Sequence, residues 1–218
     1  MKAASFESIG AADGSATLAD IKISGYDAYD PVEDEGGTSG QFSIQFLNAS
    51  GKTTATYSWF DDDVTTGWKS AGSVVDASTI KLPAAGAVWT YGAGFSITSS
   101  GAVSDADIVK NFSASGFDAV GNTTPVDVTL ADLAVTGYEP YDEVSDEGGT
   151  SGQFSIQFLN ANGRTTATYS WFDDDVTTGW KSGGVVVDPT KVTIPAGTGV
   201  WVFGAGLTLT IPSPLPVQ

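Results

Sequence analysis

Apolar and polar residues alternate along much of the chain, and the alternation is clearest at 41–48. There Phe42, Ile44 and Phe46 are separated by glutamine and serine residues. A spacing of two places these three side chains on one face of an extended strand and the polar ones on the other. The range is therefore predicted to be a strand with one buried face.

A second strand is predicted at 53–60, where Tyr57 and Trp59 share a face opposite threonine and serine. We interpret both aromatic residues as core. Between the two strands, 48–52 reads Asn-Ala-Ser-Gly-Lys, and Gly51 suits the positive φ of a hairpin loop. Further strands are predicted at 17–24, 73–75, 79–82, 87–91 and 95–98. Trp89 and Trp201 fall in such strands and are predicted to be core as well.

The whole pattern occurs twice. The stretch 34–70 returns at 146–182, an offset of 112 residues, with only Ser50 changed to Asn162 and Lys52 to Arg164. A period of this size is that of a domain. Short strands with turn residues about every 8 to 12 positions predict an all-β protein.

The predicted fold is two tandem homologous antiparallel β-sandwich domains, jelly-roll-like, at 1–108 and 109–218. Spacing alone leaves open whether each is a plain sandwich or a jelly roll. The linker holds the one helical candidate, 105–112, with Ser104 as its cap.

Identity between the copies is uneven. Residues 53–70 match their partners without exception, whereas in 77–87 only Pro83 and Ala84 match. Because cores tolerate apolar exchange, packing alone does not demand such identity. A shared function of the stretch 34–70 is one explanation, and a gene-conversion tract is the other.

Composition narrows the possible functions. Twenty-six acidic residues against nine basic ones give a net charge of -17, which opposes binding to DNA or RNA. With no cysteine and no histidine, the chain has no disulfides, no thiolate nucleophile, no Cys/His zinc site and no histidine base. Abundant Gly, Thr, Ser and Val suit an extracellular or cell-surface β protein. No stretch is apolar enough for a membrane span, and 1–14 shows no signal peptide.

Two acidic segments per copy are the candidate metal site. Calcium takes six to eight oxygen ligands, which acidic loops at strand ends supply. The candidate ligands are Asp30, Asp34, Glu35, Asp61, Asp62 and Asp63, with Asp142, Asp146, Glu147, Asp173, Asp174 and Asp175 in the second copy. If both loops lie at one end of a domain, they could share an ion. The EF-hand spacing is missing, and the alternative is that the loops are only solvated.

Trp68 and Trp180 follow the three aspartates in a predicted turn, so they are the candidate surface aromatics for stacking on a glycan. Paired carboxylates also allow a glycosidase interpretation. However, these acids are crowded on flexible glycine-rich loops, and the chain is predicted not to be an enzyme.

In general character over the whole chain, and without a family-specific motif, these tandem acidic β domains resemble secreted bacterial surface-layer or filament- and tube-forming proteins. The resemblance implies an extracellular location, bound Ca²⁺ and self-assembly into a homo-oligomer or polymer. A calcium-dependent carbohydrate-binding or adhesin module is the alternative, with glycans as partners.

Overall fold

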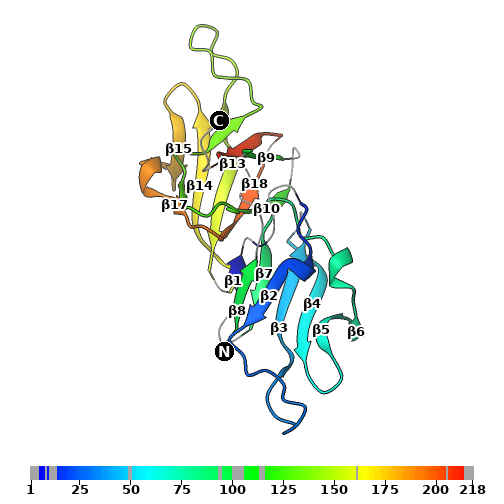
Figure 1. The fold of residues 1–218 in the computed structure, drawn as a ribbon. Helices are drawn as coiled ribbons and strands as arrows, with labels where there is room; N and C mark the ends of the chain where they lie inside the picture. The colour runs from blue at the N-terminus through cyan, green and yellow to red at the C-terminus, as the bar shows by residue number, and fades with distance from the viewer. Residues whose placement is uncertain are drawn as a thin grey trace.

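The computed structural model describes residues 5–7, 9, 14–48, 51–92, 95–99, 106–112, 116–160, 162–204 and 206–213. Over these residues the chain is all-β and its sheets are antiparallel, as predicted (Figure 1). The helical pieces there are three-residue 3-10 turns. None of the helices in this described part is long and apolar enough to cross a membrane.

The first repeat contains a six-stranded sheet in the order β1-β7-β3-β4-β5-β6 and a two-stranded sheet, β2-β8. The strands of the large sheet are β1 (Ser5–Glu7), β7 (Val88–Tyr91), β3 (Thr38–Leu47), β4 (Thr53–Asp61), β5 (Thr66–Ser70) and β6 (Ser73–Val74). The small sheet consists of β2 (Ile21–Ser24) and β8 (Ser96–Ser99).

The second repeat has the same large sheet, in the order β10-β18-β13-β14-β15-β16, and a three-stranded sheet, β12-β19-β9. The large-sheet strands are β10 (Phe117–Gly121), β18 (Gly199–Phe203), β13 (Thr150–Leu159), β14 (Thr165–Asp173), β15 (Thr178–Ser182) and β16 (Val185–Val186). The smaller strands are β12 (Ala134–Thr136), β19 (Thr208–Ile211) and β9 (Ile108–Asn111), with β11 (Val128–Thr129) pairing β17 (Thr193–Ile194).

The alternating pattern of β3 determines which face it buries. Phe42 and Ile44 are buried in one core with Ile21 of the small sheet, and Phe46, Tyr57 and Trp59 pack against that core. The period-two prediction is therefore confirmed for β3. In β4 the predicted core residues Tyr57 and Trp59 pack against the core but are only half-buried, as are the polar residues between them. The hairpin joining β3 and β4 is confirmed too, since the Gly51 N–H donates to the Asn48 carbonyl at 2.8 Å and Gly51 has a φ of +73°.

Two predicted strands are affected by 3-10 turns. Leu18–Asp20 replaces the first part of the strand predicted at 17–24 and precedes β2. The strand predicted at 79–82 does not form: Thr79 ends the turn Ala77–Thr79, and Lys81 makes only an isolated bridge to Thr17. In each case an aspartate side chain accepts a nearby backbone N–H: Asp20 that of Thr17 at 2.8 Å, and Asp76 that of Ser78 at 3.0 Å. Such local bonds compete with the strand ladder, which explains the difference.

The helix predicted at 105–112 is wrong over its described part. Residues 108–111 form β9, which pairs with β19 so that Ile108 lies opposite Ile211. Ile108 and Phe112 are buried in the core of the second repeat. Their spacing of four fits one face of a helix and one face of a strand equally well, and the distant partner strand decides in favour of the strand.

The two repeats contact each other through reciprocal tryptophans. The Trp201 ring lies over Gly51 of the first repeat and the Trp89 ring over Gly163 of the second, close enough that an added Cβ would come within 3.0 Å and 3.3 Å of them. Ala87, Trp89 and Ala119 form a small buried cluster there, with Trp201 packed on it. Trp89 is buried as predicted, but in the contact between repeats.

The reciprocal contact relates the repeats by an approximate twofold arrangement, because each repeat contributes the same residues to it. The acidic loops consequently point away from each other. Figure 1 shows the loop before β3 and the loop before β13 at opposite ends of the molecule.

Candidate functional site

We call the paired acidic loops the poles: loops 25–37 and 61–66 form the pole of the first repeat, and 137–149 and 173–178 that of the second. In the first pole the loops are joined by Asp61 at the end of β4. Its carboxylate accepts the Tyr29 N–H at 3.1 Å and the Thr66 hydroxyl at 2.9 Å, and its side chain is largely buried. The expectation that the two loops meet at one end of the repeat therefore agrees with this geometry.

The close approach of the loops also depends on Gly37. Its N–H donates to the Asp27 carbonyl. A Cβ added to Gly37 would lie 2.1 Å from the Asp61 carbonyl oxygen. Only a residue without a side chain fits between these loops.

Asp30 and Asp34 hold the first loop of this pole. The Asp30 carboxylate accepts the Val32 N–H at 2.7 Å, and the Asp34 carboxylate accepts the Tyr29 hydroxyl at 2.6 Å. The Asp30 N–H also donates to the Glu35 carbonyl at 2.7 Å, which closes the loop on itself. Both carboxylates are thus committed to local structure, as aspartates in turns commonly are.

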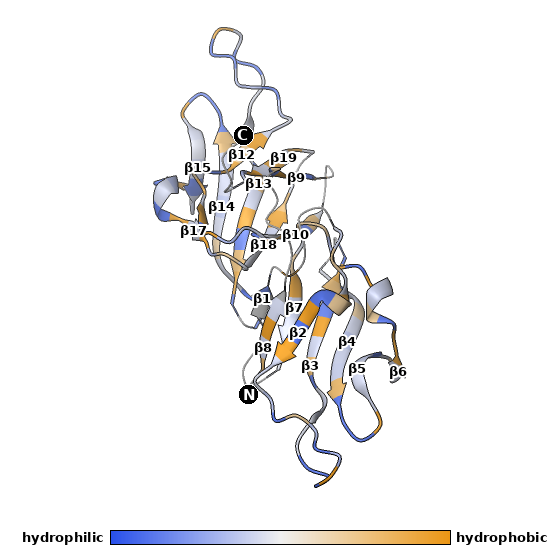
Figure 2. Ribbon diagram, viewed as in Figure 1, coloured by the Kyte–Doolittle hydropathy of each residue, from blue (hydrophilic) through white to orange (hydrophobic). Residues whose placement is uncertain are grey.

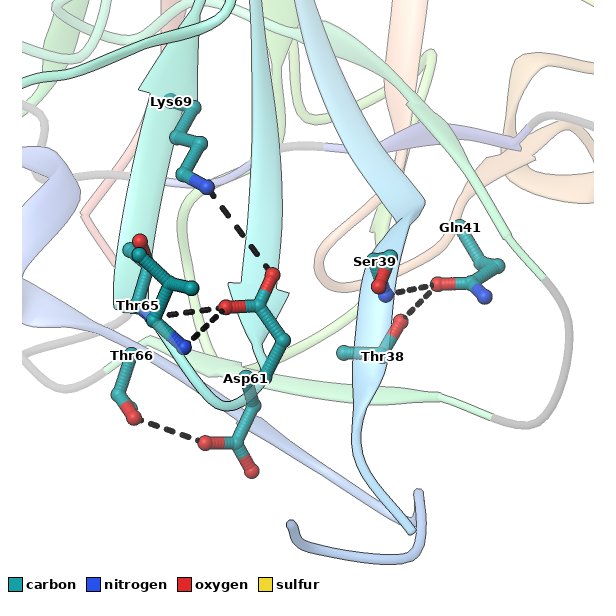
Figure 3. Close-up of polar contacts among 9 residues, drawn as sticks. Thr38, Ser39, Gln41, Asp61, Thr65, Thr66 and Lys69 are labelled. Atoms are coloured by element: carbon teal, nitrogen blue, oxygen red, sulfur yellow. Dashed lines mark hydrogen bonds and ion pairs between the residues drawn. The ribbon is translucent and has the colours of Figure 1, made fainter. Parts of the chain in front are cut away.

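Asp62 holds the second loop. Its carboxylate accepts the N–H groups of Val64 at 3.0 Å and Thr65 at 2.7 Å, and it lies 4.0 Å from the Lys69 ammonium. Lys69 also sits 4.1 Å above the Phe60 ring. Figure 3 shows the polar contacts around Asp61, Thr65, Thr66 and Lys69, beside a second set in which Gln41 turns back to accept from Thr38 and from the Ser39 N–H.

The second pole repeats these contacts. Its bonds run from Tyr141 N–H to Asp173 at 3.0 Å, Thr178 hydroxyl to Asp173 at 2.7 Å, Tyr141 hydroxyl to Asp146 at 2.6 Å, and Thr177 N–H to Asp174 at 2.7 Å. One difference is that Ser145 stands where the first repeat has Glu33, and its hydroxyl donates to Asp142 at 2.8 Å. The Val144 N–H, together with this hydroxyl, lowers the pKa of Asp142.

In each pole, neighbouring carboxylates raise the pKa of one tyrosine. The hydrogen bond to Asp34 is the main reason that the pKa of Tyr29 rises from 10.0 to about 12, with further contributions from Asp63 and Asp30. The hydrogen bond to Asp146 raises the pKa of Tyr141 to about 12 in the same way. Asp63 belongs to the second loop, so the charges of both loops act on one hydroxyl.

A pH titration should reveal these two tyrosines. Because the folded state holds the proton more tightly than the unfolded state, the stabilisation is complete below about pH 10 and is lost as the pH rises towards 12. Absorbance of tyrosinate should show two tyrosines ionising late. Asp34→Asn and Asp146→Asn should each return one of them towards 10, and unchanged late ionisation in both variants would contradict the assignment.

The calcium site predicted for each pole stays a prediction. Among the described residues, no group of three or more Asp or Glu side chains is gathered so that it could hold a metal ion. The carboxylates of Asp30, Asp61 and Asp62 accept hydrogen bonds that hold the loops. Four further carboxylates take no part in the side-chain hydrogen bonds that hold the loops. They belong to Glu35 and Asp63 in the first pole and to Glu147 and Asp175 in the second. These four carboxylates are the ones that can bind a cation without giving up a loop bond.

The candidate stacking residues are buried, which corrects the prediction of surface aromatics. Trp68 is 3% exposed and Trp180 2%. Each lies on a strand, β5 or β15, directly opposite Trp59 or Trp171. The three aspartates are followed by a tight turn and then at once by this strand, so Trp68 enters the core. Neither ring is available to a glycan.

Exposed valines at the tips of the pole loops were not predicted from the sequence. Each of the four loops carries one valine that is at least 79% exposed. These residues are Val32, Val64, Val144 and Val176. Figure 2 shows hydrophobic tips on otherwise hydrophilic loops at both ends. A β-branched apolar residue inside an acidic turn, present in both copies, was the available signal.

Comparison with known proteins adds no relative. No family model matches the chain, and neither the curated proteins nor the solved structures contain a significant match.

Proposed function

We propose that the chain is an extracellular structural protein whose copies assemble end to end through their poles, with Ca²⁺ or a similar divalent cation between them. Each repeat would be a jelly-roll-like β-sandwich, the small sheet packing on the large one. The observation that carries the proposal is the presence of two equivalent poles at opposite ends of one chain. A subunit with like contacts at both ends forms an open chain of copies.

Charge explains why such contacts would need a cation. The net charge of -17 opposes the approach of two copies, and the poles are among the most acidic parts of the sequence. A divalent cation placed between carboxylates of two poles removes this repulsion. The exposed valines at the tips would then be shielded from water when the poles meet.

The cation would be held by two copies together. One pole offers Glu35 and Asp63, or Glu147 and Asp175, as carboxylates outside the loop bonds, whereas calcium takes six to eight oxygens. Two poles facing each other double the number of these carboxylates. This arrangement is compatible with the absence of a gathered acidic group among the described residues of one pole, and it makes binding and assembly the same event.

The carbohydrate-binding alternative has less support. It needs Trp68 and Trp180 as an aromatic platform, and both are buried. The acid-rich composition still suits an extracellular or cell-surface location, which is part of the proposal.

Assembly should be tested by neutralising the poles. We expect long end-to-end particles in calcium on negative-stain micrographs and by light scattering, and their loss in EDTA. A variant with Glu35→Gln, Asp63→Asn, Glu147→Gln and Asp175→Asn should not form them. The expected loss is complete because the bridging carboxylates are absent.

The matched control removes the same number of charges elsewhere. It carries Asp20→Asn, Asp76→Asn, Asp132→Asn and Asp188→Asn, in which asparagine retains the acceptor that caps each turn. This control should still assemble in calcium. The proposal would be contradicted if the wild-type chain did not assemble in calcium. It would also be contradicted if the two variants assembled equally.

A further inference from the structure

The small sheets of the two repeats differ by one strand. In the second repeat β19 lies between β12 and β9, so both of its edges are paired. The equivalent strand of the first repeat, β8, is paired with β2 on one side, and no other described strand pairs with it (Figure 1). The edge of β8 that corresponds to the place of β9 is therefore open among the described residues.

Burial differs at the same place. Leu209 of β19 is 1% exposed and Val135 of β12 is 7% exposed. Their equivalents, Ile97 of β8 and Ile23 of β2, are only partly buried. The strand β9 adds Ile108 to this region of the second repeat. Among the residues that the structure describes, the first repeat is thus both unpaired and less covered at one site, which is how an unoccupied strand position differs from an occupied one.

The apolar residue that directly follows β9, Phe112, already has a replacement inside the first repeat. In the second repeat Phe112 packs on Phe154, with ring centroids 5.6 Å apart. In the first repeat Phe95 packs on the equivalent Phe42 at 5.5 Å, where the second repeat has only Leu207. A strand arriving at β8 would therefore need to supply backbone hydrogen bonds and a modest apolar side chain, without a large ring.

Charge indicates what can approach this edge. β8 lies within 82–104, a stretch that has no Asp, Glu, Lys or Arg in a chain of net charge -17. Two copies repel each other over most of their surfaces, but not along this strand. Its sequence, Ser-Ile-Thr-Ser, also lacks the charges and prolines that natural edge strands use to prevent pairing.

We propose that the open edge of β8 binds the β8 strand of a second copy, in antiparallel register about a twofold axis. The two small sheets then become one continuous sheet in the order β2-β8-β8-β2. Ile97 of each copy covers that of the other, as β9 covers β19. The contact needs no cation and leaves the poles free, so it is independent of the end-to-end assembly proposed above.

The first test is the oligomeric state in EDTA, where contacts between poles are absent. Sedimentation velocity of the full chain should show a dimer that dissociates on dilution. Thr98→Glu places a charge on the open edge opposite Lys22, where the fold of each copy tolerates it. With Ile97 paired to Ile97 of the other copy, the two added carboxylates lie diagonally across the contact on one face, and their repulsion should weaken self-association by about tenfold or more.

The matched control is Thr210→Glu, the equivalent position on β19, which β9 covers. It adds the same charge and should leave the dimer unchanged. A wild-type chain that is monomeric at every concentration in EDTA would overturn the proposal. So would equal effects of the two variants, which would assign the dimer to another surface.

Hydrogen exchange on the wild-type chain provides a measurement that needs no variant. Amides of 96–99 should become protected as the protein concentration rises in EDTA, while those of 208–211 stay protected throughout. Protection of 96–99 that does not depend on concentration would mean that another segment of the same chain covers β8, and would overturn the proposal. Calcium-dependent assembly can succeed or fail in either case.

Discussion

Replacing Gly37 by alanine is expected to cost about 3 to 5 kcal/mol of unfolding free energy, because two penalties add at this position. The first is backbone strain, since the residue has a φ of +81°, where an alanine is strained by about 1 to 2 kcal/mol. The second is steric. The new Cβ would lie 2.1 Å from the Asp61 carbonyl oxygen, so one loop of the pole must move away from the other.

Gly72 separates the two penalties. Its φ of +82° matches that of Gly37, but a Cβ added there would have no atom within 4 Å. Gly72→Ala should therefore cost only the strain, about 1 to 2 kcal/mol. Urea unfolding of both variants measures the difference. The pair Gly149→Ala and Gly184→Ala repeats the comparison in the second repeat, with φ values of +78° and +81°.

Equal losses for Gly37→Ala and Gly72→Ala would mean that the loops separate at no cost, and that the pole is not a tightly joined unit. If Gly37→Ala destabilises the chain more than Gly72→Ala does, the same variant can also be used to test calcium-dependent assembly. It alters the relative position of Asp63 and Glu35 without changing any charge, so it should weaken calcium-dependent assembly while Gly72→Ala does not.

The sequence predicted best where local pattern and tertiary packing agree. Phe42 and Ile44 alternate with polar residues and are buried, and Asn48 and Gly51 form the hairpin that their types indicate. The offset of 112 residues likewise predicted that both repeats would have equivalent acidic loops. In these cases the side-chain spacing and the turn residue determine the structure almost without reference to distant parts of the chain.

Prediction failed where a distant partner decides. Nothing near Ile108 indicates that β19, about a hundred residues later, will pair with it. Trp68 follows a run of aspartates, and only the pairing of β5 with β4 turns it inward, opposite Trp59. The roles of Asp61 and Asp62 as acceptors within the loops were equally invisible, because the same residue types serve turns and metal sites.

Truncating either tryptophan of the interface between the repeats is expected to destabilise the chain. The Trp201 ring stacks on Phe117 at 5.7 Å and lies over Gly51 of the first repeat, and Trp89 occupies the equivalent place over Gly163. Trp201→Ala should cost about 3 kcal/mol, at the lower end for a tryptophan because the ring is only partly buried. Trp89→Ala should behave similarly.

The two tryptophans are also expected to make the unfolding of the two repeats cooperative. Once either tryptophan is truncated, the two repeats should unfold in separate steps, seen by calorimetry as a van't Hoff enthalpy well below the calorimetric one. Trp180→Ala is the control, since Trp180 is buried within the second repeat and its removal should destabilise that repeat without weakening the interface between repeats. A single transition in both Trp89→Ala and Trp201→Ala would contradict the role of these tryptophans.

Uncoupling also bears on assembly, because the interface between the repeats is what directs the poles to opposite ends. A chain with uncoupled repeats retains every carboxylate and valine of both poles, so it should still respond to calcium. Its copies should join at variable angles, since the direction of one pole no longer determines that of the other. Short, curved or branched particles from Trp201→Ala, against straight ones from the wild-type chain, would link the geometry between the repeats to the shape of the assembly.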